Sequence, residues 1–175
     1  MRRFRERLSR LRIDARRWGW LPAITSRIAA RLGQFIGVSV VKVRERRLDT
    51  DVSPLDVPGS LDLREISAEE LLSLQGLAEV ELTAEFVRDS AKRGERVFAA
   101  LHGDRIVGYT FCAAGGGPHI DGIRVITRPD SIYAFKSFVH ADYRGKRISP
   151  ALILLADETA RDEGYLSRIG FIAVS

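Results

Sequence analysis

The chain has 175 residues, of which 45 % are apolar and 29 % charged, and this composition is typical of a globular protein rather than a disordered or fibrous one. Its single cysteine, Cys112, excludes an internal disulfide and a thiolate-rich metal site. No apolar run approaches the roughly 18 residues that cross a bilayer, and the arginine-rich N-terminus lacks the apolar stretch of a secretory signal. A cytoplasmic location is therefore expected.

The formal net charge of +5 is unevenly distributed along the chain. Residues 1–50 hold 14 Lys and Arg against 4 Asp and Glu, a net charge of +10. Residues 51–175 hold 14 against 19, a net charge of −5. The high isoelectric point thus comes from the N-terminal segment, where any argument about an anionic partner has to begin.

A basic extension is predicted over residues 1–48. Residues 2–18 combine a helical apolar stripe with eight arginines, residues 22–33 predict a second helix, and residues 38–48 alternate like a strand. The helix over 2–18 has three interpretations: it packs on the rest of the protein, it contacts an anionic membrane surface at the inner face of the membrane, or it binds nucleic acid. The last is the least favoured because no nucleic-acid-binding motif accompanies it.

Residues 49–60 are the predicted linker, because Pro54, Pro58 and Gly59 disfavour both helix and central strand. A core is predicted over residues 61–175, with elements in the order β-α-α-β-β-β-α-β. The pattern predicts a strand at 61–65, a helix that Ser67 and Glu70 open as a capping box, and a second helical stretch after Gly76. A hairpin at 97–113, a strand at 131–140, a helix that ends at Gly164 and a strand at 169–174 follow. The fold class is α/β with a mixed central sheet and flanking helices.

The segment from Phe138 to Leu152 carries the strongest chemical signal: a strand, a short basic loop and the start of a helix. Ser149 is a good N-cap and Pro150 suits the first helical position. Arg144, Lys146 and Arg147 surround a helix start whose N–H groups and dipole attract anions, so the segment predicts a phosphate or diphosphate site. The alternative is a capped helix beside a solvated basic loop. The glycine spacing matches neither a Walker A loop nor GxGxxG.

One segment resembles motif A of the GNAT (GCN5-related) N-acyltransferases. It reads Val139-His-Ala-Asp-Tyr-Arg-Gly-Lys-Arg-Ile-Ser149 and is followed by an apolar helix and Ala160-Arg-Asp-Glu-Gly-Tyr165. The resemblance covers residues 61–175. It implies a GNAT fold, acetyl-CoA or another acyl-CoA as co-substrate, and transfer of the acyl group to an amine. Two positions depart from the family pattern, because Arg147 and Ser149 stand where the family has small residues that let a pyrophosphate approach. The family's usual helix and two strands beyond the last predicted strand have no counterpart before Ser175, so a C-terminally incomplete core is expected. Three explanations stay open: the chain is a fragment, a partner completes the fold, or the protein is a reduced relative of the family.

The resemblance also implies roles for individual residues. The thioester and pantetheine would meet the backbone amides of Ser137, Phe138 and Val139, and the diphosphate would meet the loop of Arg144, Gly145, Lys146, Arg147, Ile148 and Ser149. Four weak candidates could serve as the base that deprotonates the amine: Glu81, Glu85, His119 and Asp121. The alternative for the two glutamates is a solvated acidic helix face, and for His119 and Asp121 an ordinary polar loop.

Several properties stay open at the level of sequence. The three histidines lack a metal-ligand spacing, so no metal is expected. Cys112 lacks the neighbours that activate a thiol. The acceptor amine could belong to an amino sugar, a peptide, a protein lysine or a polyamine, and a homodimer is among the possible assemblies. The competing function is a non-catalytic GNAT-derived module that binds a membrane surface or partner through its basic N-terminal helix.

Overall fold

A six-stranded mixed sheet forms the centre of the protein, in the strand order β1-β8-β7-β4-β3-β2. The computed structural model describes residues 41–49, 55–120 and 123–173. The strands of this sheet are β1 (Val41–Arg47), β2 (Asp62–Ile66), β3 (Arg96–His102), β4 (Arg105–Ala114), β7 (Ser131–Val139) and β8 (Ser167–Ala173).

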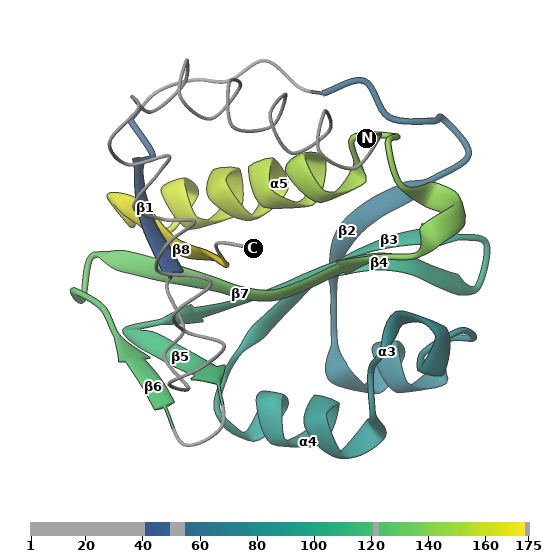
Figure 1. Ribbon diagram of the computed structural model, residues 1–175, viewed down its shortest axis with the longest axis horizontal. Helices are drawn as coiled ribbons and strands as arrows, with labels where there is room; N and C mark the ends of the chain where they lie inside the picture. The colour runs from purple at the N-terminus through teal and green to yellow at the C-terminus, as the bar shows by residue number, and fades with distance from the viewer. Residues whose placement is uncertain (1–40, 50–54, 121–122, 174–175) are drawn as a thin grey trace, which may run out of the picture. The chain divides into compact units, whose positions relative to one another are not determined.

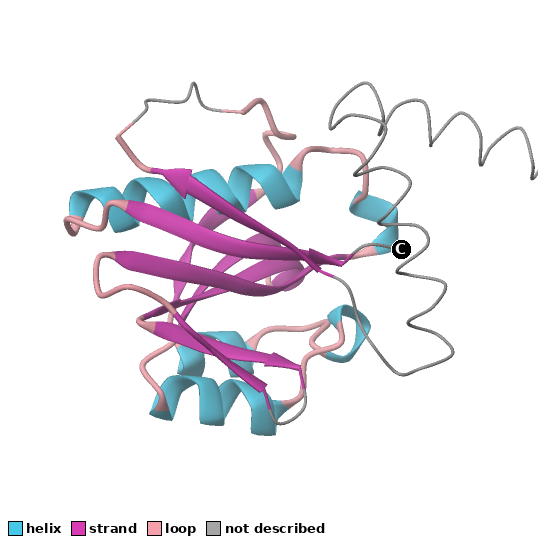
Figure 2. Cartoon of the chain, turned by 60° about the vertical axis from the view of Figure 1, so that its left-hand side comes forward, coloured by secondary structure: helices cyan, strands magenta, loops and turns pink. Residues whose placement is uncertain are grey.

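Helices cover both faces of the sheet, as Figure 1 shows. On one face lie α3 (Ala68–Ser73), the 3₁₀ helix η1 (Ala78–Val80) and α4 (Ala84–Lys92), and on the other lies α5 (Ile148–Asp162). A hairpin of β5 (Gly116–Ile120) and β6 (Ile123–Ile126) forms a second, two-stranded sheet on the side of α4 (Figure 2). The prediction of a mixed α/β sheet with flanking helices is confirmed.

Local signals account for where α3 and α4 begin. The Ser67 hydroxyl accepts a hydrogen bond from the Glu70 amide at 3.1 Å and caps α3, as predicted. The Glu70 carboxylate, however, pairs with Arg64 of β2 rather than completing the capping box. Thr83 caps α4 in the same way, through the Phe86 amide at 3.2 Å. The predicted hairpin at Gly103-Asp104 joins β3 to β4.

The strand β7 has an antiparallel neighbour on one side and a parallel neighbour on the other. It pairs antiparallel with β4 and parallel with β8, and α5 is the crossover that a parallel pair requires. Pairing with β8 runs from Ser131 to Ala134, whereas pairing with β4 continues to Val139. Two residues of β7, Lys136 and Ser137, oppose the single residue Thr110 of β4, which makes a β-bulge.

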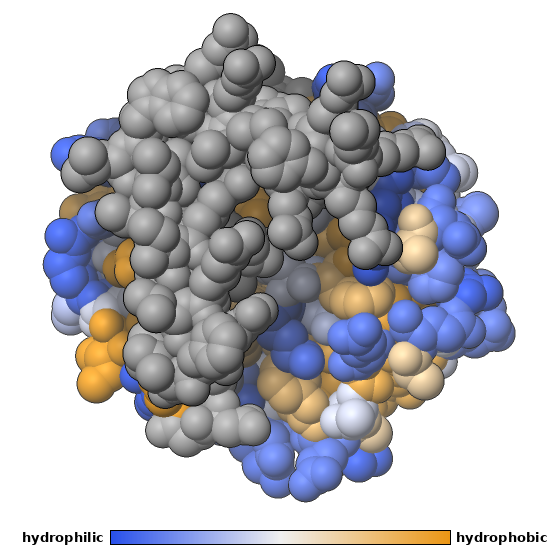
Figure 3. Space-filling view, in the orientation of Figure 1, coloured by the Kyte–Doolittle hydropathy of each residue, from blue (hydrophilic) through white to orange (hydrophobic). Residues whose placement is uncertain are grey.

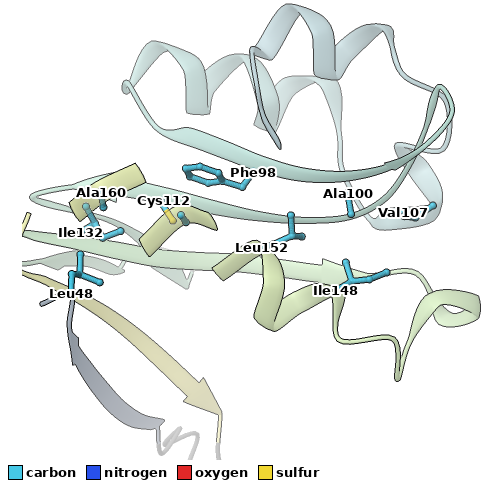
Figure 4. Close-up of a cluster of buried hydrophobic side chains, with 10 residues drawn as sticks. Leu48, Phe98, Ala100, Val107, Cys112, Ile132, Ile148, Leu152 and Ala160 are labelled. Carbon is cyan, nitrogen blue, oxygen red and sulfur yellow. The ribbon is translucent and has the colours of Figure 1, made fainter. Parts of the chain in front are cut away.

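The core under α5 is built from alternating residues of the sheet. Phe98 and Ala100 of β3, Cys112 of β4 and Ile132 of β7 pack against Ile148, Leu152, Ala156 and Ala160 of α5, as the close-up in Figure 4 shows. Leu48, which follows β1, belongs to the same cluster and is only 3 % exposed. Apolar burial of this kind is the main stabilising contribution to such a fold.

The chain divides into two compact units, Glu45–Gly170 and a second that combines Met1–Arg44 with Phe171–Ser175. The first unit therefore extends upstream of residue 61, where the sequence places the start of the core. The helices predicted over 2–18 and 22–33 lie outside the described residues, while the strand predicted over 38–48 is present as Val41–Arg47. No helix among the described residues is long and apolar enough to cross a membrane. On the part of the described surface that is in view in Figure 3, hydrophilic residues alternate with patches of apolar residues.

Candidate functional site

The loop between β7 and α5 is the basic segment that the sequence singles out. Arg144, Gly145, Lys146 and Arg147 are all exposed, and Gly145 and Arg147 have left-handed backbones with φ of +80° and +59°. The Arg144 Nε donates to the Val139 carbonyl oxygen at 3.1 Å, and the Lys146 Nζ lies 4.7 Å from the centre of the Tyr143 ring. These contacts hold the side chains near the helix start without neutralising them.

The Arg144 amide donates to the Ala141 carbonyl at 3.2 Å, but the amides that follow it toward α5 have no hydrogen-bond acceptor among the described residues. Within the described ranges, no hydrogen bond is made by the N–H groups of Lys146, Arg147, Ile148 and Ser149. The first N–H groups of a helix lack an intrahelical partner and carry the positive end of its dipole. Together with three cationic side chains, they make a surface suited to a phosphate or diphosphate.

The prediction that Ser149 caps α5 is wrong. The capping position is Arg147, in the left-handed region and without a side-chain cap, so Ser149 is the second helical residue and Pro150 the third. Ile148 explains the earlier start: it is 2 % exposed and packs against Gly108, where an added Cβ would lie 3.2 Å from the Ile148 methyl. Burial of Ile148 thus outweighs the local preference of Ser149. Its side chain belongs to the core, and only its amide faces the loop.

Arg147 occupies a backbone conformation that suits glycine. A left-handed conformation costs a residue with a Cβ about 1–2 kcal/mol. This matches the sequence comparison, in which Arg147 stands where the family has glycine. The departure therefore keeps the loop conformation at a cost in stability and adds a cation at the helix start.

The predicted thioester-binding residues lie on the end of β7 that extends beyond its pairing with β8. Ser137 belongs to the bulge, and its hydroxyl shares a 2.7 Å hydrogen bond with Thr110. Phe138 stacks on Tyr109 of β4 with 6.3 Å between ring centres. Val139 packs at the edge of the α5 core. Because β8 pairing ends at Ala134, the β7 edge from Phe135 to Val139 has no strand partner on that side among the described residues.

On the face covered by α4, aromatic rings form a continuous row that we call the aromatic row. Its neighbouring ring centres are 5.4 to 6.3 Å apart, and its members are Tyr133, Phe135, Phe111, Tyr109 and Phe138. Phe86 of α4 stands edge-on to Phe111 at 5.1 Å. The row ends at the bulge, beside the predicted thioester site.

The four candidate bases do not form one cluster. The prediction that Glu81 and Glu85 lie one turn apart on one helix is wrong, because Glu81 ends η1 in a left-handed conformation and Glu85 lies in the first turn of α4. Both are exposed. The His119 Nδ1 lies 2.8 Å from the Tyr133 hydroxyl, at the far end of the aromatic row. Asp121 lies outside the described residues.

Glu81 is the candidate base whose charge acts on Tyr109, beside the predicted thioester site. The element that it ends, η1, packs against β4. Burial and the negative charge of Glu81 together raise the pKa of Tyr109 to about 12, with burial the larger cause. Tyr109, in turn, stacks on Phe138. A carboxylate, a protonated tyrosine and the end of β7 thus lie close together.

Two further residues, His140 and Cys112, have surroundings that indicate structural roles. The His140 Nδ1 accepts from the Asp142 amide at 3.3 Å, in keeping with a structural role. Burial raises the pKa of the Cys112 thiol to about 12, so it stays protonated at neutral pH. No group of three or more potential metal ligands lies within the parts of the chain that the structure describes.

Sequence reasoning missed Tyr109 and left Lys136 undecided. Tyr109 reads as an ordinary apolar strand position, and its place at the end of the aromatic row follows only from strand pairing. Lys136 is mid-strand, and the sequence leaves its orientation undecided. In the structure it sits on the bulge with φ of +42°, and its Nζ lies 4.8 Å from the centre of the Phe86 ring. Nothing in the local sequence marks a bulge at this position.

Comparison with known proteins identifies a family model and solved structures that are similar to this chain. The model of the acetyltransferase (GNAT) family matches residues 61–175. A solved GCN5-related N-acetyltransferase from Sphaerobacter thermophilus is similar at 16 % identity and a TM-score of 0.53, over 83 % of this chain and 47 % of that one. An acetyltransferase from Trypanosoma brucei matches at 21 % identity and a TM-score of 0.43, over 59 % of this chain and 77 % of that one. No curated protein matches the chain. Because the family match spans more than half of its length, the chain belongs to the GNAT acetyltransferase family.

Proposed function

We propose that this protein is an N-acyltransferase that moves an acetyl group from acetyl-CoA to an amine. The observation that carries the proposal is the β7–α5 loop: amides without protein acceptors at the start of α5, beside three cations without carboxylate partners among the described residues. The Asp142 carboxylate, next to the loop, lies 3.7 Å from His140 rather than on a loop cation. This arrangement fits the diphosphate of CoA.

The chemistry follows from what lies next to the loop. The amine nitrogen attacks the thioester carbonyl carbon, so that a C–N bond forms and the C–S bond breaks. The CoA sulfur leaves with the electron pair and is protonated, and the overall reaction of an ammonium releases one further proton. The amides of the β7 edge near Ser137 to Val139 would stabilise the charge that develops on the carbonyl oxygen. Glu81 is the carboxylate best placed to take a proton from the ammonium.

Titration of CoA into the full-length protein by isothermal calorimetry tests the proposal. Gly145→Val would force a branched side chain into the left-handed region of the loop and should weaken CoA binding by about tenfold or more. Gly164→Val is the matched control, because Gly164 also has a left-handed φ of +89°, has open space around its Cα and lies at the other end of α5. Both variants should lose similar stability, and only the first should lose CoA affinity.

Two outcomes contradict the proposal in different ways. Absence of CoA and acetyl-CoA binding to the folded full-length chain removes the site itself. Binding without release of free CoA thiol in the presence of any amine would leave a CoA-binding protein that is not a transferase.

A further inference from the structure

Lys136 holds a charge in an unusual place. It lies on the β7 bulge, its backbone is in the left-handed region at φ of +42°, and its side chain is exposed. A residue with a Cβ pays about 1–2 kcal/mol for this conformation. The ammonium is held over the Phe86 ring at 4.8 Å, a contact worth about 0.5–1 kcal/mol at an exposed site. The contact positions the charge on the α4 side of the sheet but does not neutralise it.

No carboxylate lies within 4.0 Å of the Lys136 ammonium among the residues that the structure describes. Lys92 of α4 shows the usual arrangement, since its ammonium lies 2.9 Å from the Asp89 carboxylate. The charge of Lys136 is therefore available to a ligand, one residue from Ser137 and two from Phe138, where the thioester is expected.

An exposed carboxylate lies at the same end of the aromatic row. Glu81 ends η1, and η1 packs on β4. The negative charge of Glu81 helps to raise the pKa of Tyr109, and Tyr109 stacks on Phe138. The bulge carries Lys136 toward Phe86, on the same face of the sheet. An acidic and a basic group thus flank the aromatic surface beside the predicted site of transfer.

We infer that the acceptor is a small molecule that carries an anionic group beside its amine, such as a free amino acid. This inference rests on the proposed function. Glu81 meets the ammonium and takes its proton, and Lys136 pairs with the carboxylate of the acceptor. The amine nitrogen then forms the C–N bond to the acetyl carbon while the C–S bond breaks and the CoA sulfur leaves with its electron pair. The nitrogen loses a second proton as the amide forms, and the CoA sulfur gains one to become the thiol. A polyamine or amino sugar would bring a second cation against Lys136 and is disfavoured.

The test compares matched acceptors with full-length protein and acetyl-CoA, measured as release of CoA thiol. The panel contains the free amino acids, their methyl esters, which lack the negative charge, and spermidine. We expect kcat/KM to be about tenfold or more higher for an amino acid than for its ester. We also expect spermidine to be the poorest acceptor.

Variants separate the charge of Lys136 from its backbone role. Lys136→Gly suits the left-handed backbone and removes the charge, and Lys136→Gln keeps a polar, flexible side chain without the charge. Both should raise KM for the amino acid by about tenfold and leave the ester unchanged, since only the carboxylate uses the ammonium. Arg88→Gln is the control: Arg88 is an exposed cation on α4, and its loss should change neither substrate.

The outcomes divide cleanly. Equal rates for acids and esters, preference for spermidine, or Lys136→Gln that slows both substrates alike would overturn the inference. No turnover with any panel member, in a protein that still binds CoA, also overturns it. Failure to bind CoA instead overturns the proposed function on which it rests.

Discussion

Two sets of arginines and lysines behave differently in this protein. Around β2, β3 and α5 the cations are paired: Arg64 contacts Asp62 and Glu70, Arg96 contacts Glu65 and Glu163, and Asp157 receives both Arg46 and Arg168. In the β7–α5 loop, Arg144, Lys146 and Arg147 have no carboxylate partner within the described ranges. A carboxylate partner neutralises a cation within the fold. We therefore infer that the paired cations stabilise the structure and that the unpaired loop cations are available to bind an anionic ligand.

The burial of the two sets sharpens this comparison. The Asp157 side chain is 6 % exposed, with Arg168 Nε at 2.6 Å and Arg46 at 3.1 Å, so it forms a buried charge cluster between α5 and the strands β1 and β8. The loop cations are all exposed. Substitutions in the paired set should therefore change the free energy of unfolding. Substitutions of the loop cations should instead change the affinity for an anionic ligand.

The largest expected effect is on the buried cluster. Asp157→Ala removes the carboxylate and leaves Arg46 and Arg168 without a counter-charge, which should lower the free energy of unfolding by about 3–5 kcal/mol. Urea denaturation followed by circular dichroism measures it. Glu158→Ala is the control, since Glu158 is the next residue on α5 but exposed. A loss under about 1 kcal/mol in Asp157→Ala would mean that the buried cluster is not structural.

The next effect is on the loop. Replacement of Arg144, Lys146 and Arg147 together by alanine should weaken CoA binding by about tenfold or more, because the loss of even one charge-assisted hydrogen bond costs about 1.5–3 kcal/mol and 1.4 kcal/mol is a factor of ten. The unfolding free energy should not fall. The wild-type affinity should also decrease as salt is raised, and that salt dependence should be smaller in the triple variant. A triple variant that unfolds more easily but binds CoA normally would reverse the distinction between the two sets.

A smaller effect separates conformation from charge at a single loop position. Arg147→Gly removes the left-handed strain and should raise the unfolding free energy by about 1–2 kcal/mol. The same change removes a cation, so we expect CoA affinity to fall or stay level while stability rises. Thermal unfolding measures the change in stability, and calorimetry on the same preparation measures the CoA affinity. A less stable Arg147→Gly variant would show that the Arg147 side chain supports the fold.

The last effect is absent at neutral pH and concerns the core beneath the paired set. Burial raises the pKa of Cys112 from 9.0 to about 12, so above pH 9 the unfolded thiol loses its proton while the folded one keeps it. Stability present below pH 9 is then lost as the pH rises toward 12, by up to about 1.4 kcal/mol per pH unit. Cys112→Ala should reduce the slope of stability against pH in this window. An unchanged slope would assign the loss to other groups, such as Tyr109 and Tyr133.

The sequence predicts the fold well because strong local signals mark its elements. The Ser67 cap, the Gly103-Asp104 hairpin and the basic segment before α5 are all local features, and each is found where it was expected. The start of α5 was mispredicted because Ser149 and Pro150 are favourable locally, whereas burial of Ile148 against Gly108 decides the boundary. That contact joins residues 40 positions apart and leaves no local signal.

The candidate site was harder to predict for the same physical reason. Leu82 and Phe86 suggest one continuous helix, and the Thr83 cap that starts a new one is a short signal inside that pattern. The bulge at Lys136 shifts the alternation of β7, so which face each residue takes depends on pairing with Thr110. Glu81, Tyr109 and Lys136 come from three elements, and only the sheet brings them to one face.

Leu48 and Arg46 bear on how the protein can be divided for experiments. The family match begins at residue 61, which invites expression of 61–175 alone. Such a fragment would open a void where Leu48 packs beneath α5 and would remove one of the two cations that Asp157 contacts. The Leu48 amide also donates to the Leu166 carbonyl at 2.9 Å, just before β8. The shortest fragment suitable for crystallisation or binding assays should therefore retain the strand at 41–47 and Leu48.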